Sequence, residues 1–446
     1  SGIVAYAFVK GSGTPSYTTI TATTSQISKT YTATGAGTYY FYAKDQAGNS
    51  SSKSVTIAKG AGKVTLSATS GSVAYGTTSK TFTASRLGDG ALTVSDNNAT
   101  ATVSISNGTV TISNIGSLTA GTKVVVTVSA AAGTNYNAAS ATYTLTINKA
   151  TPTITLSASS GSVNYGASAT FTAKPSVAGT WTVSSSASGV SAISAASSTA
   201  TANTNTTMTY TGAAAGSATL TIKLTPTDTT NYNTKSVTFA ATVNKVAATN
   251  PTLTDATKTY NGSALSIGVS GGIGGTIYYR TSTDNSTWGS WSTTKPSRTT
   301  AGTTYVQAYV KGDANHTDTG ATASKKITIN KATPTITLSA SSGSVNYGAS
   351  ATFTAKPSVA GTWTVSSSAS GVSAISAASS TATANTNTTM TYTGAAAGSA
   401  TLTIKLTPTD TTNYNTKSVT FAATVNKIAG KVTLSATSGS VTYGTA

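Results

Sequence analysis

The stretch TPTITLSASSGSVNYGASATFTAKPSVAGTWTVSSS, residues 151–186, determines the fold class of this chain. Its segments TPTITLSAS, SATFTAKP and GTWTVSSS place Ile, Leu, Phe, Trp and Val at alternate positions among small or polar residues. A period of two is typical of a β-strand with one buried face. The intervening SSGSVNYG is rich in turn residues, and no part of the chain has capped apolar residues at helical spacing. The stretch therefore predicts short β-strands joined by turns.

This stretch occurs twice. Residues Thr146–Lys245 recur letter for letter as Thr328–Lys427, at an offset of 182 positions, and residues 61–73 recur as 429–441. A folded enzyme rarely needs the same hundred residues twice. An array of structural units does, because each unit folds on its own and the copy number changes only length or valency. The repeats therefore predict an array of units, which we call modules.

A closing phrase, Thr-Ile-Asn-Lys or Thr-Val-Asn-Lys, marks the module ends. An Asn-Tyr-Asn triplet lies upstream of it three times, and Asn315-His316-Thr317 takes that place in the remaining module. We predict that Tyr136, Tyr232 and Tyr414 pack on the module body while the Asn neighbours hold a turn. The marks predict a domain at 1–59 that lacks its N-terminal part, complete domains at 60–149, 150–245, 246–331 and 332–427, and the start of a further domain at 428–446.

Modules of 86 to 96 residues with turns every few residues fit a two-sheet sandwich. They also resemble the bacterial immunoglobulin-like repeats of invasin- and intimin-type adhesins and of Gram-positive surface adhesin arrays. The resemblance rests on VTLSATSGSVAYGTTSKTFTA at 64–84, GTKVVVTVSAAAGTNYNAASATYTLTINK at 121–149 and their counterparts. With KTYNGSALSI and YVQAYVKGDANHTDTG, module 246–331 resembles a sister subtype. The resemblance implies an all-β tandem array of immunoglobulin-like β-sandwich domains that forms an elongated rod.

The charge balance is strongly basic, with 27 Lys and Arg, nine Asp, no Glu and a net charge of +18. It indicates either attraction to polyanions or a generic basic surface. Only Lys325 and Lys326 are adjacent bases, and no basic cluster alternates with aromatic residues, so no specific nucleic-acid site is predicted. The partners we consider are cell-surface glycans, anionic wall polymers, and self-association along a filament or with neighbouring chains. No apolar run reaches the roughly 18 residues of a membrane span.

Catalytic chemistry has almost no candidates, because the chain has no Cys, no Glu and a single histidine, His316. His316 stands where sister modules have Tyr, so a packing or turn role is expected. No Asp-x-Asp-x-Asp calcium loop is present, and the repeated module has one acid, Asp228 or its twin Asp410. We predict no enzyme, cofactor or metal site, and leave calcium and Lys–Asn isopeptide stabilisation undecided.

The candidate ligand contacts are Tyr278, Tyr279, Trp288 and Trp291, within TIYYRTSTDNSTWGSW. Adjacent strand residues point to opposite faces, so one Tyr should be exposed and able to stack on a sugar. The favoured alternative is that Trp288 or Trp291 fills the core or its edge, as Trp181 and Trp363 are expected to do.

The leading functional prediction is a structural stalk of a large, secreted adhesin-type protein on the cell surface, which projects a binding tip. The alternatives are a phage virion fibre or capsid-decoration protein, and a glycan- or polyanion-binding module. The location expected is extracellular, or a virion in the first alternative.

Overall fold

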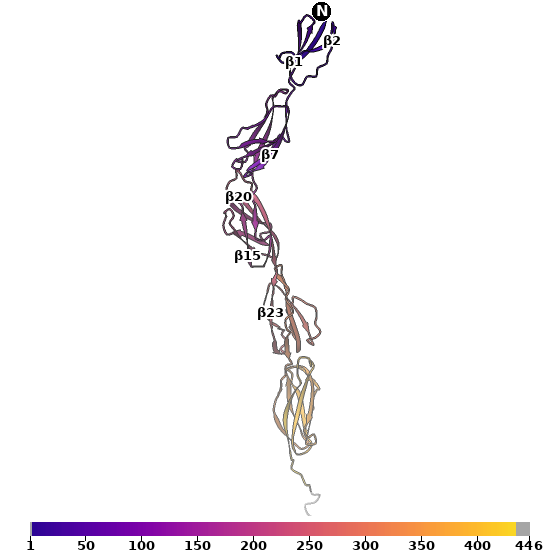
Figure 1. Cartoon of the computed structure of the whole chain (residues 1–446). Coiled ribbons are helices and arrows are strands. Elements are labelled where there is room, and N and C mark those ends of the chain that lie inside the picture. The colour runs from indigo at the N-terminus through magenta and orange to yellow at the C-terminus, as the bar shows by residue number, and fades with distance from the viewer. Residues whose placement is uncertain (1, 434–446) are drawn as a thin grey trace, which may run out of the picture. The chain divides into compact units, whose positions relative to one another are not determined.

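The structure is a computed structural model that describes residues 2–433. Every regular element in this range is a β-strand (Figure 1), which confirms the all-β prediction. The Ala-rich segment 192–202 forms no helix. Strand β17 (Ser191–Ala195) begins one residue before it, and β18 (Thr199–Ala200) lies within it. Within the described range no helix is long and apolar enough to cross a membrane. Backbone contacts divide the chain into two compact units, Ser1–Asn244 and Lys245–Ala446.

The first segment of the first unit forms one antiparallel sheet in the order β2-β1-β3-β4. Its strands are β1 (Ile3–Lys10), β2 (Thr18–Thr24), β3 (Gly37–Asp45) and β4 (Ser50–Ile57). Val55 and Ile57 of β4 are 61% and 41% exposed, which is unusual for sheet residues of this type. A sandwich needs a second sheet over such a face. Residues 3–57 form only one sheet of such a sandwich. That 1–59 is a partial domain therefore stays a proposal.

Residues 60–149 form two sheets, in the orders β5-β7-β10-β9 and β6-β12-β11-β8. The pair β6–β12 is parallel and all other pairs are antiparallel. The first sheet contains β5 (Lys63–Leu66), β7 (Ser79–Leu87), β9 (Thr102–Ser106) and β10 (Thr109–Ser113). The second contains β6 (Ser70–Ala74), β8 (Leu92–Asp96), β11 (Lys123–Ala130) and β12 (Ala139–Asn148).

The core of residues 60–149 lies between these sheets and follows the period of two. Val124, Val126 and Val128 of β11 are fully buried, and the residues between them are half-buried. Phe82 of β7 stacks on Tyr143 of β12 with ring centroids 4.1 Å apart, which joins one sheet to the other. The alternation seen in the sequence thus becomes the inner face of an immunoglobulin-like sandwich.

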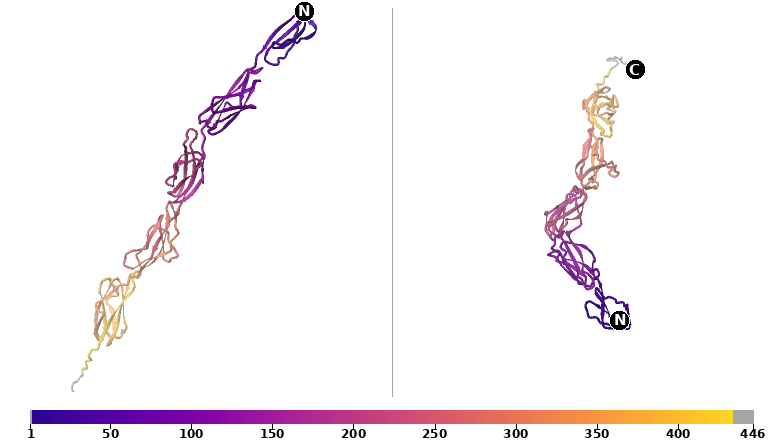
Figure 2. Two further views of the ribbon diagram at one scale, coloured as in Figure 1. Left: turned by 60° about the vertical axis from the view of Figure 1, so that its left-hand side comes forward. Right: turned by 90° about the horizontal axis from the view of Figure 1, so that it is seen from above.

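Residues 150–244, which are purple to magenta in Figure 2, repeat this plan. Their sheets have the orders β13-β15-β19-β17 and β14-β21-β20-β16-β18. The further strands are β13 (Ile154–Leu156), β14 (Ser160–Asn164), β15 (Ser168–Pro175), β16 (Gly179–Ser185), β19 (Thr206–Gly212), β20 (Gly216–Pro226) and β21 (Lys235–Asn244). Trp181 is 6% exposed, and its indole Nε1 donates to Thr206 Oγ1 at 3.0 Å. Its predicted place in the core is confirmed, as is that of Trp363, which is 5% exposed.

In the second unit, residues 332–426 have the same strand orders, β32-β34-β38-β36 and β33-β40-β39-β35-β37. The strands are β32 (Ile336–Leu338), β33 (Ser342–Asn346), β34 (Ser350–Pro357), β35 (Gly361–Ser367), β36 (Ser373–Ala377), β37 (Thr381–Ala382), β38 (Thr388–Gly394), β39 (Gly398–Pro408) and β40 (Lys417–Asn426). The further domain predicted at 428–446 lies, from residue 434 on, outside the described residues.

Residues 246–331 also form sheets, but with a different partition. The largest has the order β24-β31-β29-β27, and three two-stranded pairs, β22-β30, β23-β26 and β25-β28, complete the segment. The strands are β22 (Val246–Ala247), β23 (Thr249–Thr254), β24 (Ala256–Thr259), β25 (Leu265–Ser266), β26 (Gly268–Ile273), β27 (Gly275–Ser282), β28 (Ser297–Arg298), β29 (Gly302–Gly312), β30 (His316–Thr317) and β31 (Lys325–Asn330).

Candidate functional site

The two adjacent tyrosines of β27 lie on opposite faces of the sheet, as the strand geometry predicts. Tyr279 is 6% exposed and belongs to the core, beside Val306 and Ala308. Burial raises the pKa of its phenol above the usual value. Tyr278 lies on the outer face, where it is half-buried and pairs across the strands with Tyr309. Tyr279 is therefore not part of the outer surface on which a sugar could stack, although it lines the hollow described below.

The two tryptophans lie outside the core and flank one cation. The Arg280 guanidinium is 5.1 Å from the Trp288 ring and 4.6 Å from the Trp291 ring, both within cation–π range. Arg280 Nε and Nη2 also donate to Gln307 Oε1, at 2.9 and 2.6 Å. The expectation is that Trp288 or Trp291 fills the core or its edge. Its first half is wrong, because the loop after β27 carries both rings to the outer face of the sheet, where they are half-buried. A structural role at the edge stays a prediction.

The loop that carries the tryptophans is held in place by its own hydrogen bonds. Asp284 accepts from the backbone N–H groups of Ser286 and Thr287, at 2.8 and 2.7 Å, and from the Ser282 hydroxyl at 2.7 Å. The N–H groups of the following residues, Thr287 first, hold the pKa of Asp284 well below its usual range. Ser292 and Tyr279 exchange two backbone hydrogen bonds, so the loop is pinned to β27 at its far end.

The resulting surface is a compact set of rings around a charged group. Trp291 packs edge-to-face on Tyr309 with centroids 4.6 Å apart, and Tyr309 lies 5.5 Å from Tyr278. We call these three rings, together with Trp288 and Arg280, the aromatic face. Arg280 and Tyr309 were not among the residues singled out from the sequence. The alternation of YVQAYVK at 305–311 carried the signal for Tyr309, since it places every second residue of β29 on one side.

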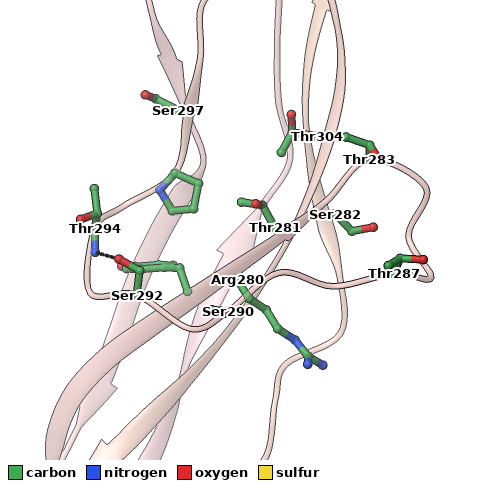
Figure 3. A pocket seen from close by; sticks show the side chains of 12 residues that line it. Arg280, Thr281, Ser282, Thr283, Thr287, Ser290, Ser292, Thr294, Ser297 and Thr304 are labelled. Atoms are coloured by element: carbon green, nitrogen blue, oxygen red, sulfur yellow. Dashed lines mark hydrogen bonds between the residues drawn. The ribbon is translucent and has the colours of Figure 1, made fainter.

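Beside the aromatic face, strand and loop residues line an open hollow of about 580 Å³. Its lining is dominated by hydroxyl side chains, and Figure 3 shows the Arg280 guanidinium pointing away from Ser297 and Thr304. The hydroxyl groups of this lining can donate and accept hydrogen bonds. The hollow can therefore hold water or a polyol.

The single histidine lies beside an acidic residue, Asp313. His316 Nδ1 lies 2.7 Å from Asp313 Oδ1, and the His316 side chain is 17% exposed, which fits the predicted turn or packing role. Among residues 2–433 no three of His, Cys, Asp or Glu gather as metal ligands.

A Lys–Asn cross-link would need Lys149, Asn231 and the acid Asp228, which do lie near one another. Asn231 Nδ2 donates to Asp228 Oδ2 at 2.8 Å, and Lys149 Nζ donates to the Thr229 carbonyl at 2.6 Å. The bond from the Asn231 side chain holds the pKa of Asp228, an exposed group, below its usual range. The acid is therefore exposed and ionised, whereas the cross-linking reaction needs a buried carboxylate beside the Lys–Asn pair. The arrangement favours hydrogen bonds over a covalent link.

No protein-family model matches the chain. Among curated proteins none matches either.

Solved structures with similar folds include domains 1–6 of the surface layer protein SbsC, 18% identical, covering 82% of this chain and 55% of that one, with a TM-score of 0.22. Sidekick-1 immunoglobulin domains 1–5 are 10% identical and cover 95% and 92%, with a TM-score of 0.26. Titin domains Z1Z2, in a complex with telethonin, are 17% identical and cover 42% and 98%, with a TM-score of 0.25. This chain thus spans about half of the SbsC structure, and the relation is a loose, immunoglobulin-like one.

Proposed function

We propose that the chain is a structural stalk or spacer of an extracellular surface protein, which holds a binding tip away from the cell. The proposal assigns it no enzymatic activity. The observation that carries it is that the linkers after modules are bonded into the module that follows. Residues of three linkers form parallel β-bridges with the Asn-Tyr-Asn turn of the next module: Gly60 with Tyr136, Ala150 with Tyr232, and Ala332 with Tyr414.

The lysine directly before each linker residue of these bridges makes a second hydrogen bond to the module that follows. Each donates from Nζ to a backbone carbonyl of the next module's turn: Lys59 to Gly133 at 2.8 Å, Lys149 to Thr229 at 2.6 Å, and Lys331 to Thr411 at 2.6 Å. A linker of a few residues that is bonded at both its backbone and its side chain has little freedom to bend. Semi-rigid linkers between sandwiches are what a spacer requires, since flexible ones would let the array collapse.

Small-angle X-ray scattering on the whole chain tests this proposal. Four complete modules of about 35 Å reach on the order of 140 Å, which for a rod gives a radius of gyration of about 40 Å. A compact chain of the same length would have roughly 22 Å. As a control, a flexible Gly-Ser insertion between Lys149 and Ala150 should broaden the distance distribution of the rod. A compact parent protein, or one that the insertion leaves unchanged, would overturn the proposal.

A second candidate function is binding of an acidic sugar by the aromatic face. Two observations favour it. The rings of Tyr278, Trp291 and Tyr309 lie outside the core, and no carboxylate of the described residues forms an ion pair with Arg280. Rings of this kind stack on the apolar faces of sugars, and an arginine without an acidic partner complements a carboxylate or sulfate.

The expected result is retention of the whole chain on a uronic-acid polymer, weaker retention on the neutral polymer, and loss of both with rising salt. Tyr309→Ala, which removes the ring between Trp291 and Tyr278, should reduce binding several-fold. Tyr305→Ala is the matched control, because Tyr305 lies on the same face of β29 but pairs with Ser282 and Lys326 and not with an aromatic residue. Equal binding by the two variants, or equal retention on both polymers, would exclude this candidate.

A further inference from the structure

The Asn-Tyr-Asn turns reach across the boundary to the preceding module. In three places the side-chain Oδ1 of the first Asn accepts a hydrogen bond from a backbone N–H far back in the chain. The pairs are Ala36 with Asn135 at 2.9 Å, Ala120 with Asn231 at 2.9 Å, and Ala301 with Asn413 at 2.7 Å. The sequence assigned these Asn residues to a turn within their own module. The structure gives their side chains a second partner.

Each donor lies in the same kind of loop, an Ala followed by a Gly. The glycines have positive φ angles of 138° at Gly37, 95° at Gly121 and 131° at Gly302, a conformation that favours Gly. At the last pair the contact is dry, because Ala301 is 7% and Asn413 6% exposed. A buried N–H without an acceptor is destabilising. The Ala-Gly loop therefore needs the Asn oxygen that the next module supplies.

The accepting Asn is oriented in advance by its own module. Asn231 donates from Nδ2 to Asp228 Oδ2 at 2.8 Å and from its backbone N to Asp228 Oδ1 at 3.0 Å. Asn413 bonds Asp410 at the same distances. Because Nδ2 is committed to the carboxylate, Oδ1 must point the other way, toward the preceding module. This fixed orientation means that little entropy is lost when the contact forms.

The tyrosine of the triplet makes a second contact with the same partner. Tyr232 packs edge-to-face on Tyr75 of the preceding module, and Tyr414 does so on Tyr260, with centroids 5.4 Å apart in both cases. Tyr75 precedes Gly76 directly, and Tyr260 precedes Gly262 by two residues. Edge-to-face pairs of this type contribute about 0.5–1.5 kcal/mol beyond their buried area.

We propose that the Asn-Tyr turn and the Ala-Gly loop are the two halves of a directional interface, a knob and a socket, which joins modules 60–149, 150–245 and 332–427 each to the module before it. At the second and third of these junctions a tyrosine beside the loop belongs to the socket. Each socket binds the module that follows it. That module carries the Asn-Tyr knob, and its turn also forms a β-bridge with the linker. The contacts of the interface are made by residues of this chain and do not depend on the proposed function.

The end of module 332–427 carries the same socket without a knob among the described residues. Ala397 precedes Gly398, whose φ is 152°, and Tyr347 is 54% exposed, whereas Tyr75 and Tyr260 are half-buried under their partners. An exposed aromatic beside a loop amide for which the described residues 2–433 provide no acceptor has the chemistry of the occupied sockets. This end therefore fits the Asn-Tyr knob of a further module of the same kind.

Hydrogen exchange on the full chain with the substitution Asn413→Ala tests the interface. We expect the peptide that contains Ala301 to exchange about tenfold faster, because its N–H loses its acceptor. The peptide that contains Ala120 should be unchanged, since Asn231 still covers it in the same molecule. A role of Asn413 confined to its own turn would leave Ala301, which belongs to the other module, at the parent rate.

Two further variants keep the result interpretable. Asn415→Ala is the matched control, because Asn415 bonds Thr333 of its own module, and it should not change exchange at Ala301. If Asn413→Ala unfolds residues 332–426, Asn135→Ala replaces it. The Asn135 side chain bonds Ala36, and the turn keeps its backbone bond to Asp89. Parent exchange rates at Ala301 in a folded Asn413→Ala protein, or at Ala36 in Asn135→Ala, would overturn the proposal.

Discussion

Replacing Phe239 by alanine is expected to lower the free energy of unfolding of residues 150–244 by about 3–5 kcal/mol. Phe239 lies on β21, is 1% exposed, and stacks on Phe171 of the opposite sheet with centroids 4.0 Å apart and planes 5° from parallel. The two rings are therefore a direct link between the layers. Strands held by ladder hydrogen bonds cannot collapse into the space that a lost ring leaves, so most of the cavity cost remains.

The duplicated module supplies the control in the same molecule. Phe421 stacks on Phe353 with the same centroid distance, 4.0 Å, in a module of identical sequence. Single-molecule pulling on the full chain should show two modules of matching unfolding force in the parent and one weakened module in Phe239→Ala. Phe421→Ala should weaken the other one. Two modules that remain indistinguishable in either variant would show that the ring stack contributes little to their stability.

The sequence predicted which residues of the duplicated module are buried because each strand alternates strictly. Trp181 and Phe239 fall on the buried phase of that alternation, and both lie in the core. It did not predict the parallel pairing of β14 with β21, in which Ser160 lies opposite Ala240. Neither strand contains a local signal for a partner some 80 residues away, so this pairing is decided by how the two sheets close.

For the aromatic face, the period of two predicted that Tyr278 and Tyr279 lie on opposite faces of the sheet. It could not predict which of the two faces is exposed to solvent. The tryptophans follow no period, because they lie in a loop. Their position depends on a cation–π contact with Arg280, which has no sequence spacing of its own. A loop residue that packs on a strand through one side chain is invisible to pattern arguments.

The sequence indicated only part of the interface between modules. The fixed distance from the Asn-Tyr-Asn triplet to the module end indicated a shared structural task, and the task was assigned to the module itself. The true partner of Asn413 is Ala301, 112 positions earlier, in another module. An Ala-Gly pair before Thr or Ser does recur in the chain, but in a composition rich in these residues it does not stand out.

Removing residues 246–331, so that Lys245 is followed directly by residue 332, is expected to increase misfolding sharply. The flanking modules have identical strands in identical registers: Ser160 pairs with Ala240 in one and Ser342 with Ala422 in the other. Every strand of one module then has an equally good partner in its neighbour. Exchange of strands between like domains is a characteristic failure of repeat proteins. In the parent chain residues 246–331, with their different sheet partition, separate the two copies.

Repeated pulling and relaxation measures this directly, since a pair of modules that have exchanged strands unfolds as one event of doubled contour length. Such events should be frequent in the deletion variant and rare in the parent. A chain that carries a copy of residues 60–149 in place of 246–331 is the matched control. It should behave like the parent, because any non-identical spacer removes the competing strands. If the deletion variant misfolds no more often than the parent, the spacing of the two copies gives no protection. Their order would then reflect only duplication of a block of 182 residues.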